Sequence, residues 1–209
     1  MSHYDDEAQV EQLRRWWREN WMALAGGLVL GLAGIFGWEA WQSARTAKAE
    51  NASQIYEDLK KLPADKSAQA TELGKKLADD YSGTPYAAQA ALYLANMAVQ
   101  RSDWDGARAQ LDWVVAHAGD PGLKKIARLR LARVLWQQDR LDDALAQLDV
   151  PDDDPFAALY QELRGDLQLA KGDRAAARSA YEKALQLGPA AASRDGLQRK
   201  LDDLAGAAS

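Results

Sequence analysis

Residues 132–148 read ARVLWQQDRLDDALAQL, and residues 165–181 read GDLQLAKGDRAAARSAY. Aligned at an offset of 33 residues, the two segments keep one order: a small residue, a polar turn, a second small residue and then a bulky residue. An earlier copy, offset by 37 residues, starts at Ala95 and places Ala107 and Leu111 at the later positions. Repeats with a period of roughly 20 to 50 residues are typical of stacked units that share one continuous core. The sequence therefore predicts a solenoid of helical hairpins.

The segments around the repeat also read as helices separated by short breaks. No run of alternating β-branched residues occurs after residue 65, so we predict an all-α domain. Its expected helices span residues 66–80, 85–101, 103–118, 121–138, 140–149, 155–171, 173–187 and 191–204.

Three of the breaks place a capping residue directly before a proline: Thr84-Pro85, Asp120-Pro121 and Asp154-Pro155. A Thr or Asp side-chain oxygen can accept a hydrogen bond from the first turn of a helix, and proline suits the first helical position. We therefore expect Thr84, Asp120 and Asp154 to cap the helices that follow them.

An uncharged segment lies before the repeats. Residues 21–41 read WMALAGGLVLGLAGIFGWEAW, and the first eighteen of them carry no charge. That length of helix crosses a hydrocarbon core of about 30 Å. Five of the eight tryptophans lie near its two ends, where an indole can bury its ring and keep its N–H hydrated. These five are Trp16, Trp17, Trp21, Trp38 and Trp41.

Two other interpretations of this segment are a buried helix of a soluble protein and a cleaved signal peptide. Soluble core helices rarely stay uncharged over such a length, and the apolar part of a signal peptide is only about 7 to 15 residues long, after a short basic segment. Here twenty residues precede the span, and five of them are acidic. We predict an uncleaved transmembrane helix in a lipid bilayer.

Four small residues fall on one face of the predicted span: Ala23, Gly27, Gly31 and Gly34. Such a stripe lets another membrane helix approach closely, which predicts helix–helix docking. The alternative is that glycine is simply common in membrane helices.

Charge alone leaves the orientation of the span open. Three arginines lie in the twenty residues before it, and four basic residues lie in the twenty after it. Counting only the nearest ten residues on each side gives three against two, a slight preference for a cytoplasmic N-terminus.

The chain therefore divides into four expected parts. Residues 1–20 form a tail, either an interfacial helix continuous with the span or a disordered segment. Residues 21–41 form the transmembrane helix, residues 42–64 a helical stalk, and residues 65–209 the repeat domain.

Composition and motifs argue against several classes of function. The net charge is −5, and the residues after Trp41 carry −2 of it, so we expect no nucleic-acid partner. The absence of cysteine excludes disulfides and thiolate metal sites. His3 and His117 stand far apart and belong to no catalytic motif. The acidic run from Asp149 to Asp154 lacks the pattern of a calcium loop and indicates a solvated turn, with a weak cation site as the alternative. We expect no catalytic residue, metal or cofactor.

The last copy of the repeat resembles the tetratricopeptide repeat. Gly165, Ala177, Tyr181, Ala184 and Pro189 match the small, small, aromatic, small and proline positions of that family. It departs from the family in carrying glutamine where large aromatics are preferred, at residues 161 and 168.

The whole arrangement resembles the YfgM family of ancillary Sec translocon subunits. It combines a short tail, one glycine-rich span and about three repeats, the last of which carries Glu162-Leu-Arg-Gly165-Asp, Lys171-Gly-Asp173 and Ala177-Arg-Ser-Ala-Tyr181-Glu. The resemblance implies a single-pass bacterial inner-membrane protein with a cytoplasmic N-terminus and a periplasmic repeat domain. It also implies association with the SecYEG translocon and the membrane-anchored chaperone PpiD, and help in handing emerging polypeptides to periplasmic chaperones. An assembly or stress-regulatory scaffold of the same membrane, without contact to translocating chains, is the alternative.

The resemblance also implies a binding groove, lined by the first helices of the hairpins. The family's groove positions fall on Gln89, Leu92, Asn96, Val99 and Gln100, on Ile126, Leu129, Arg133, Trp136 and Gln137, and on Leu159, Glu162, Asp166, Leu169 and Ala170. Trp136, flanked by Arg133 and Gln137, has the composition of a binding hot spot. Its alternative role is that of an ordinary core tryptophan between repeats.

Overall fold

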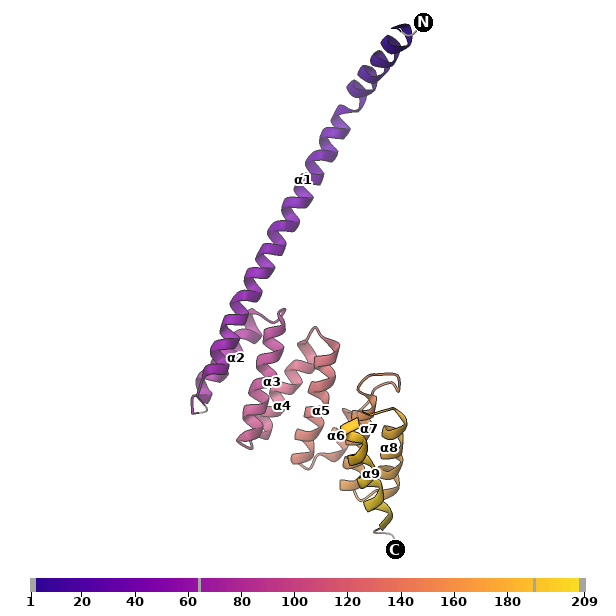
Figure 1. Ribbon diagram of the computed structural model, residues 1–209. Coiled ribbons are helices and arrows are strands. Elements are labelled where there is room, and N and C mark those ends of the chain that lie inside the picture. Colours follow the sequence, from indigo (N-terminus) through magenta and orange to yellow (C-terminus); the bar gives the residue numbers. More distant parts are fainter. Residues whose placement is uncertain (1–2, 64, 190, 207–209) are drawn as a thin grey trace. The chain divides into compact units, whose positions relative to one another are not determined.

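The computed structural model describes residues 3–63, 65–189 and 191–206 (Figure 1). The ends of the predicted tail and of the predicted repeat domain, residues 1–2 and 207–209, lie outside the described residues, as do residues 64 and 190. All regular secondary structure in the described residues is helical, which confirms the all-α prediction. The helices are α1 (His3–Lys61), α2 (Ser67–Asp80), α3 (Pro85–Gln100), α4 (Trp104–His117), α5 (Pro121–Gln137), α6 (Leu141–Ala146), α7 (Ala157–Ala170), α8 (Arg174–Gln186) and α9 (Ala191–Gly206).

The bounds of α2 to α9 agree with the expected ranges to within two residues, except at the end of α6. That helix ends at Ala146 because the chain tightens there. The N–H of Gln147 donates to the carbonyl of Ala144 at 3.1 Å, and the N–H of Leu148 donates to that of Leu145 at 3.0 Å. Hydrogen bonds between residues three apart are typical of a closing 3₁₀ turn. Leu148 still reaches the core, where it is buried.

The long helix α1 belongs to two compact units, the first ending at Glu50 and the second beginning at Asn51. In the first unit it is helical from His3 and contains the one described segment that is long and apolar enough to cross a membrane. None of the 18-residue window that meets this test is buried. The core helix of a soluble protein would be covered by the rest of the chain, so the exposure favours the transmembrane interpretation. The boundaries of tail, span and stalk stay predictions.

In the second unit, the end of α1 is part of the repeat core. Ala52 and Leu59 are fully buried in one cluster with Leu77 of α2 and Leu94 of α3. The sequence assigned residues 51–61 to the stalk. The structure packs them against α2 and α3, because the apolar side chains of this segment repeat at helical spacing and need a buried face.

The positions that define the repeat are buried in all three copies. At the closest approach, a Cβ added to Gly165 of α7 would overlap with the ring of Tyr181 of α8. The small residue therefore lets the two helices pack closely, while the bulky residue fills the space between them. The buried sets are Ala95, Ala107 and Leu111 in α3 and α4, Ala132, Ala144 and Leu148 in and after α5 and α6, and Gly165, Ala177 and Tyr181 in α7 and α8.

The same turn joins the two helices of each copy. A residue with positive φ ends the first helix: Ser102 at 57°, Asp139 at 58° and Gly172 at 84°. The N–H of the next residue donates to the carbonyl five residues earlier, at 2.9 Å in all three turns, which is the hydrogen bond of a Schellman motif. These turns lie 37 and 33 residues apart, the same offsets that relate the copies in the sequence.

Of the three expected caps before proline, one is right. The side chain of Asp120 accepts a hydrogen bond from the N–H of Leu123 at 3.0 Å. The Thr84 hydroxyl instead donates to the carbonyl of Tyr81 at 2.8 Å. Asp154 accepts from the N–H of Phe156 and pairs with Lys125, and α7 begins only at Ala157.

Two caps were not expected from the sequence. Asp103 and Asp173 each accept a hydrogen bond at 2.9 Å, from the N–H of Gly106 and of Ala176 respectively. Both follow directly on the positive-φ residue of their turn. Caps therefore follow the positive-φ residue in the first and third copies, whereas Arg140 takes this position in the second copy and makes no side-chain cap.

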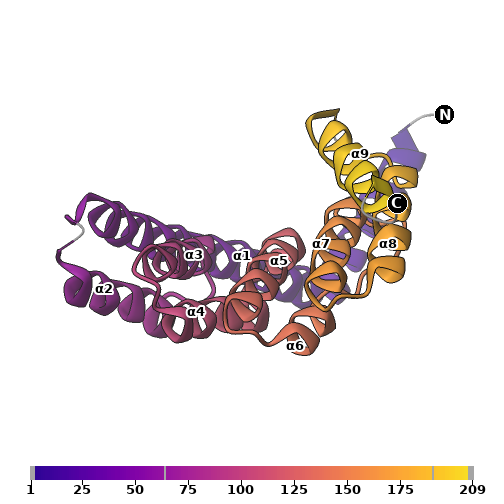
Figure 2. The same cartoon turned by 90° about the horizontal axis from the view of Figure 1, so that it is seen from below.

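Successive hairpins stack through both of their helices. The second helix of one copy contacts the first helix of the next, as α4 does with α5 and α6 with α7. First helices also contact each other, α3 with α5 and α5 with α7. Figure 2 shows the pairs α3/α4, α5/α6 and α7/α8 following one another. The first helices thus line one face of the stack, which carries the candidate site.

Replacing Gly165 with Ala should destabilise the repeat domain by about 1 to 3 kcal/mol, because the new methyl group overlaps with a fully buried tyrosine ring. Gly196→Ala is the matched control. No described atom lies within 4 Å of a Cβ at Gly196 in α9, and alanine favours a helix by up to about 1 kcal/mol over glycine. Thermal and urea unfolding of the full chain in mild detergent, followed by circular dichroism, measures both. Equal stability of the two variants would contradict close packing at Gly165.

Candidate functional site

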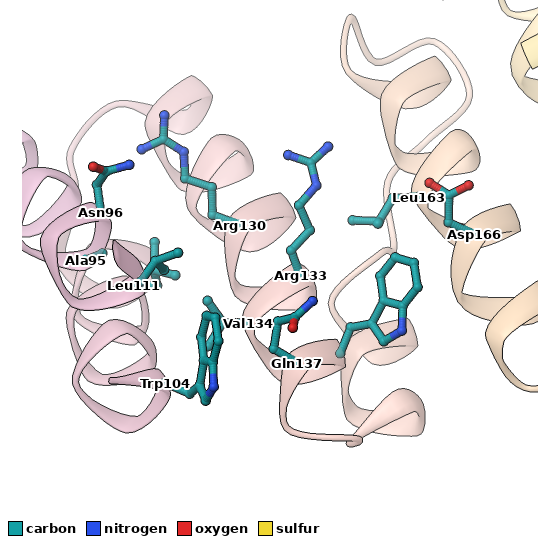
Figure 3. A pocket seen from close by; sticks show the side chains of 12 residues that line it. Ala95, Asn96, Trp104, Leu111, Arg130, Arg133, Val134, Gln137, Leu163 and Asp166 are labelled. Atoms are coloured by element: carbon teal, nitrogen blue, oxygen red, sulfur yellow. The ribbon is translucent and has the colours of Figure 1, made fainter. Parts of the chain in front are cut away.

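A groove of about 620 Å³ opens between α3, α4, α5 and α7 (Figure 3). Its lining residues are Ala95, Asn96, Val99, Trp104, Leu111, Arg130, Arg133, Val134, Trp136, Gln137, Leu163 and Asp166. The structure thus brings together six of the residues expected in the groove, namely Asn96, Val99, Arg133, Trp136, Gln137 and Asp166. Their role in binding stays a prediction.

The groove has an apolar floor and a polar rim. Leu111, Val134 and Leu163 are buried at its base, where they belong to the main core cluster. Trp104 and Trp136 pack against the same cluster but remain partly exposed. Trp136 therefore contributes both to the core and to the groove surface, and its role as a binding hot spot stays a prediction.

The rim carries exposed polar and charged groups. Arg130, Arg133 and Gln137 lie at successive turns of α5, and all three are exposed. Figure 3 shows the two arginine side chains extending from α5 in the same direction. Across the groove on α3, Asn96 accepts a hydrogen bond from Gln100 at 2.9 Å.

The acidic end of the groove is occupied by a side chain of α9. The Lys200 ammonium lies 2.7 Å from a carboxylate oxygen of Asp166 and 3.0 Å from one of Glu162. Tyr181 donates its hydroxyl to Asp166 at 2.8 Å, and Lys200 lies 5.4 Å from the centre of the Tyr181 ring. Both carboxylates of α7 are therefore paired within the chain.

Two groups at this end have raised pKa values. Burial acts to lower the pKa of the Lys200 ammonium, but its hydrogen bonds to Asp166 and Glu162 outweigh burial, so the pKa lies above the ordinary value of 10.5. Burial, aided by the hydrogen bond to Asp166, raises the pKa of Tyr181. At neutral pH Lys200 is a cation and Tyr181 a neutral donor, as the pairing requires.

The other expected groove residues lie outside the lining. Leu129 is only 7% exposed and belongs to the core, because it lies one position before Arg130 and so points away from the groove. Glu162 is half-buried beside Lys200. Gln89 is half-buried and Gln100 exposed on α3, and neither lines the groove. The further set expected from the family (Leu92, Ile126, Leu159, Leu169 and Ala170) also lies outside it.

Sequence reasoning did not place Arg130, Trp104 or Lys200 in this site, nor the apolar lining residues Ala95, Leu111, Val134 and Leu163. Arg130 could have been found, since it precedes Arg133 by one helical turn. Trp104 begins α4, a second helix, whereas all the expected groove positions lie on first helices. No pattern in the sequence around Lys200 predicts that it belongs to the site. Lys200 is 34 residues from Asp166 in sequence, and only the packing of α9 brings the two together.

The small residues of α1 show no contact that would explain them. Ala23 is exposed, and no described atom lies within 4 Å of a Cβ built at Gly27, Gly31 or Gly34. Nothing in the described chain covers this stripe, and its role in helix docking stays a prediction.

The acidic run after α6 is occupied by ion pairs. Asp152 lies 2.7 Å from the Lys183 ammonium, and Asp154 pairs with Lys125. The pKa of Asp154 is lowered by its hydrogen bonds to Lys125 and to the N–H of Phe156. In the part of the chain that the structure describes, no group of three or more His, Asp or Glu side chains could hold a metal ion.

Comparison with known proteins gives one consistent result. The tetratricopeptide repeat-like domain family matches residues 14–206. A protein of Escherichia coli (strain K12), named as an ancillary SecYEG translocon subunit, is 35% identical over 205 residues, which covers 98% of this chain and 99% of the relative. Relatives of the same name from Haemophilus influenzae and Neisseria gonorrhoeae are 34% and 30% identical, over 88% and 97% of this chain and 90% and 99% of their own lengths.

Replacing Lys200 with Gln should destabilise the repeat domain by about 1 to 3 kcal/mol at neutral pH, because two partly buried carboxylates lose their cation. The raised pKa of Lys200 means that its contribution is fully present below about pH 10.4 and is lost as the pH rises through the folded value. The difference from the unmodified chain should therefore shrink in strongly alkaline buffer. Urea unfolding across this pH range measures it.

The control for this variant is Lys76→Gln. Lys76 is exposed on α2, and no described residue pairs with it, so its replacement should change stability by no more than about 0.5 kcal/mol. If Lys200→Gln lowered the free energy of unfolding no more than this control does, the contacts to Glu162 and Asp166 would contribute no more than solvent-screened surface ion pairs.

Proposed function

The chain belongs to the family of ancillary SecYEG translocon subunits, and we propose on that basis that it serves the Sec translocon as a non-catalytic, membrane-anchored scaffold. The observation that carries the proposal is the extent of the similarity, which includes the apolar part of α1 as well as the repeat domain. Similarity to these relatives that was confined to the repeats would support only a shared fold, because one fold hosts many unrelated functions.

The partners follow from the family and from the resemblance noted in the sequence. SecYEG is the partner that the relatives' name specifies. The chaperone PpiD and emerging polypeptides are the partners that the resemblance implies, and the scaffold helps to hand translocated polypeptides to the chaperone network. The groove supports this role, since an apolar floor between polar walls suits an extended segment of polypeptide.

A scaffold fits the chemistry of the groove better than an enzyme does. Its lining contains no serine, cysteine, histidine or lysine, and its one carboxylate, Asp166, is paired with Lys200 and Tyr181. What it offers is surface: two partly exposed indoles, two guanidinium groups and two side-chain amides. These groups bind and orient a chain rather than cleave it.

The proposed location is the bacterial inner membrane, crossed once by α1. The exposed, uncharged window of α1 and the tryptophans at its ends support the span. We assign a cytoplasmic N-terminus and a periplasmic repeat domain from the resemblance, together with the slight excess of arginine just before Trp21.

Affinity purification of the tagged full chain in mild detergent tests the proposal. Recovery of SecYEG subunits with a periplasmic chaperone is the expected result. If both were absent from a preparation that retains the intact chain, the translocon role would be removed, and the alternative of a separate assembly or stress-regulatory scaffold would take its place.

The proposed orientation predicts the outcome of a protease experiment. Protease added to spheroplasts should digest the repeat domain, because that domain lies outside the inner membrane. In inverted vesicles the same domain should be protected. The reverse pattern would place the repeat domain in the cytoplasm and reject the assignment.

The small-residue stripe predicts the behaviour of an anchor variant. Gly27→Leu combined with Gly31→Leu should leave membrane insertion intact but reduce recovery of the translocon, because bulky side chains hold the two helix backbones apart. Ala25→Leu combined with Ala33→Leu adds bulk on another face of the same helix and is the matched control. If the glycine variant recovered as much translocon as the unmodified chain, the small residues would not be a docking surface and would reflect only the usual glycine content of membrane helices.

A further inference from the structure

The charge of the groove differs in sign from the charge of the whole protein. Three charged side chains line it: Arg130, Arg133 and Asp166. Asp166 is already bound to the Lys200 ammonium and to the Tyr181 hydroxyl. The two arginines form no ion pair or side-chain hydrogen bond with any described residue. The charge that the groove offers to a partner is therefore positive, although the chain carries a net charge of −5.

The two arginines are also close neighbours. Residues three positions apart lie side by side on a helix surface, and like charges there repel. Both side chains are exposed and extend to the same side of α5 (Figure 3). Two adjacent guanidinium groups without an anion are well suited to bind carboxylates, which they can contact through paired, charge-assisted hydrogen bonds.

Apolar surface lies directly beside these cations. Val99 of α3 is 37% exposed, and Trp104 and Trp136 are partly exposed over a floor of buried side chains. An apolar or aromatic side chain of a bound segment could rest on this surface and remove it from water. A segment that also carries a carboxylate next to that side chain would satisfy both parts of the groove at once.

We propose that the groove between α3, α4, α5 and α7 selects extended polypeptide segments in which acidic side chains flank an apolar or aromatic one. The proposal rests on the proposed function in so far as it takes polypeptide to be the ligand. It adds the chemical class of the segment and the residues that select it: Arg130 and Arg133 for the carboxylates, and Trp136 for the apolar side chain.

Lys200 makes this selection possible. Without the ammonium group, Glu162 and Asp166 would present two uncompensated carboxylates at the α7 side of the groove and repel an acidic segment. With Lys200 in place, both are paired within the chain. The terminal helix thus sets the sign of the charge that a ligand meets.

The test uses the full chain in nanodiscs and three fluorescein-labelled synthetic peptides. One carries glutamates around a phenylalanine and a leucine, the second has glutamine at the same positions, and the third has lysine. Fluorescence anisotropy should give the tightest binding for the glutamate peptide, at least about threefold tighter than for the glutamine peptide, as expected for exposed charge pairs. The preference should fall as NaCl rises from about 50 to about 500 mM, because salt screens exposed charges.

Matched variants assign the preference to particular residues. Arg130→Gln combined with Arg133→Gln should abolish the preference for the glutamate peptide over the glutamine peptide. Replacing the same two residues with lysine should restore most of the preference. Arg194→Gln combined with Arg199→Gln removes the same charge from exposed positions of α9 that do not line the groove, and should keep the preference. Trp136→Ala should weaken binding of the glutamate and glutamine peptides alike.

Three results would overturn the proposal: equal affinity for the glutamate and glutamine peptides, no binding of any peptide, or a preference that survives in the arginine variant. Affinity purification of the same proteins separates this failure from failure of the proposed function. Translocon subunits recovered without any peptide preference would reject the groove proposal alone. A clear preference in a chain that recovers no translocon subunit would reject the translocon role and leave the groove proposal standing.

Discussion

Close approach of two helices at a small residue is the constraint on which the repeat domain depends. In the last copy the backbone of Gly165 lies against the ring of Tyr181, with no room for a Cβ between them. Ala95 and Ala132 occupy the corresponding position in the earlier copies, with Leu111 and Leu148 as the bulky residues, and all four are buried. Because each hairpin closes in the same way, successive hairpins present matching surfaces and share one core. The groove exists because this stacking brings the first helices together along one face.

The fold could be predicted from the sequence because its signal is local and repeated. Small and bulky positions at offsets of 37 and 33 residues fixed the hairpins, and the turns between them recur at those offsets. The capping prediction was less successful, because each predicted cap rested on a single side chain rather than on a repeated pattern. Thr84 and Asp154 carry the right side chains, but each has a competing partner, the Tyr81 carbonyl and the Lys125 ammonium. A single capping residue says which hydrogen bond is possible, and only the surrounding structure decides which one forms.

The candidate site depends on information that no single repeat contains. The family's positions led to Arg133, Trp136 and Gln137 in the lining, since these follow from the register of one helix. Leu129 shows the limit of that approach, because one residue is a rotation of about 100° around a helix and separates the core from the groove. The register of one helix cannot predict the position of Lys200 at all. Its partners lie on a helix 34 and 38 residues earlier, and the pairing arises from tertiary packing rather than from any pattern in α9 itself.

The terminal helix joins the stability of the domain to the chemistry of its groove. Leu197 and Leu204 of α9 are buried in one cluster with Tyr181, so the helix covers apolar surface that the last hairpin would otherwise expose. The same helix carries Lys200 to the carboxylates of α7. The packing of α9 therefore covers the core and neutralises the acidic end of the groove at the same time. It follows that the charge a ligand meets depends on α9 being packed in place, even though α9 contributes no lining residue of its own. The net charge of the chain says nothing about this local sign, because the acidic residues near the groove are already paired and the arginines are not.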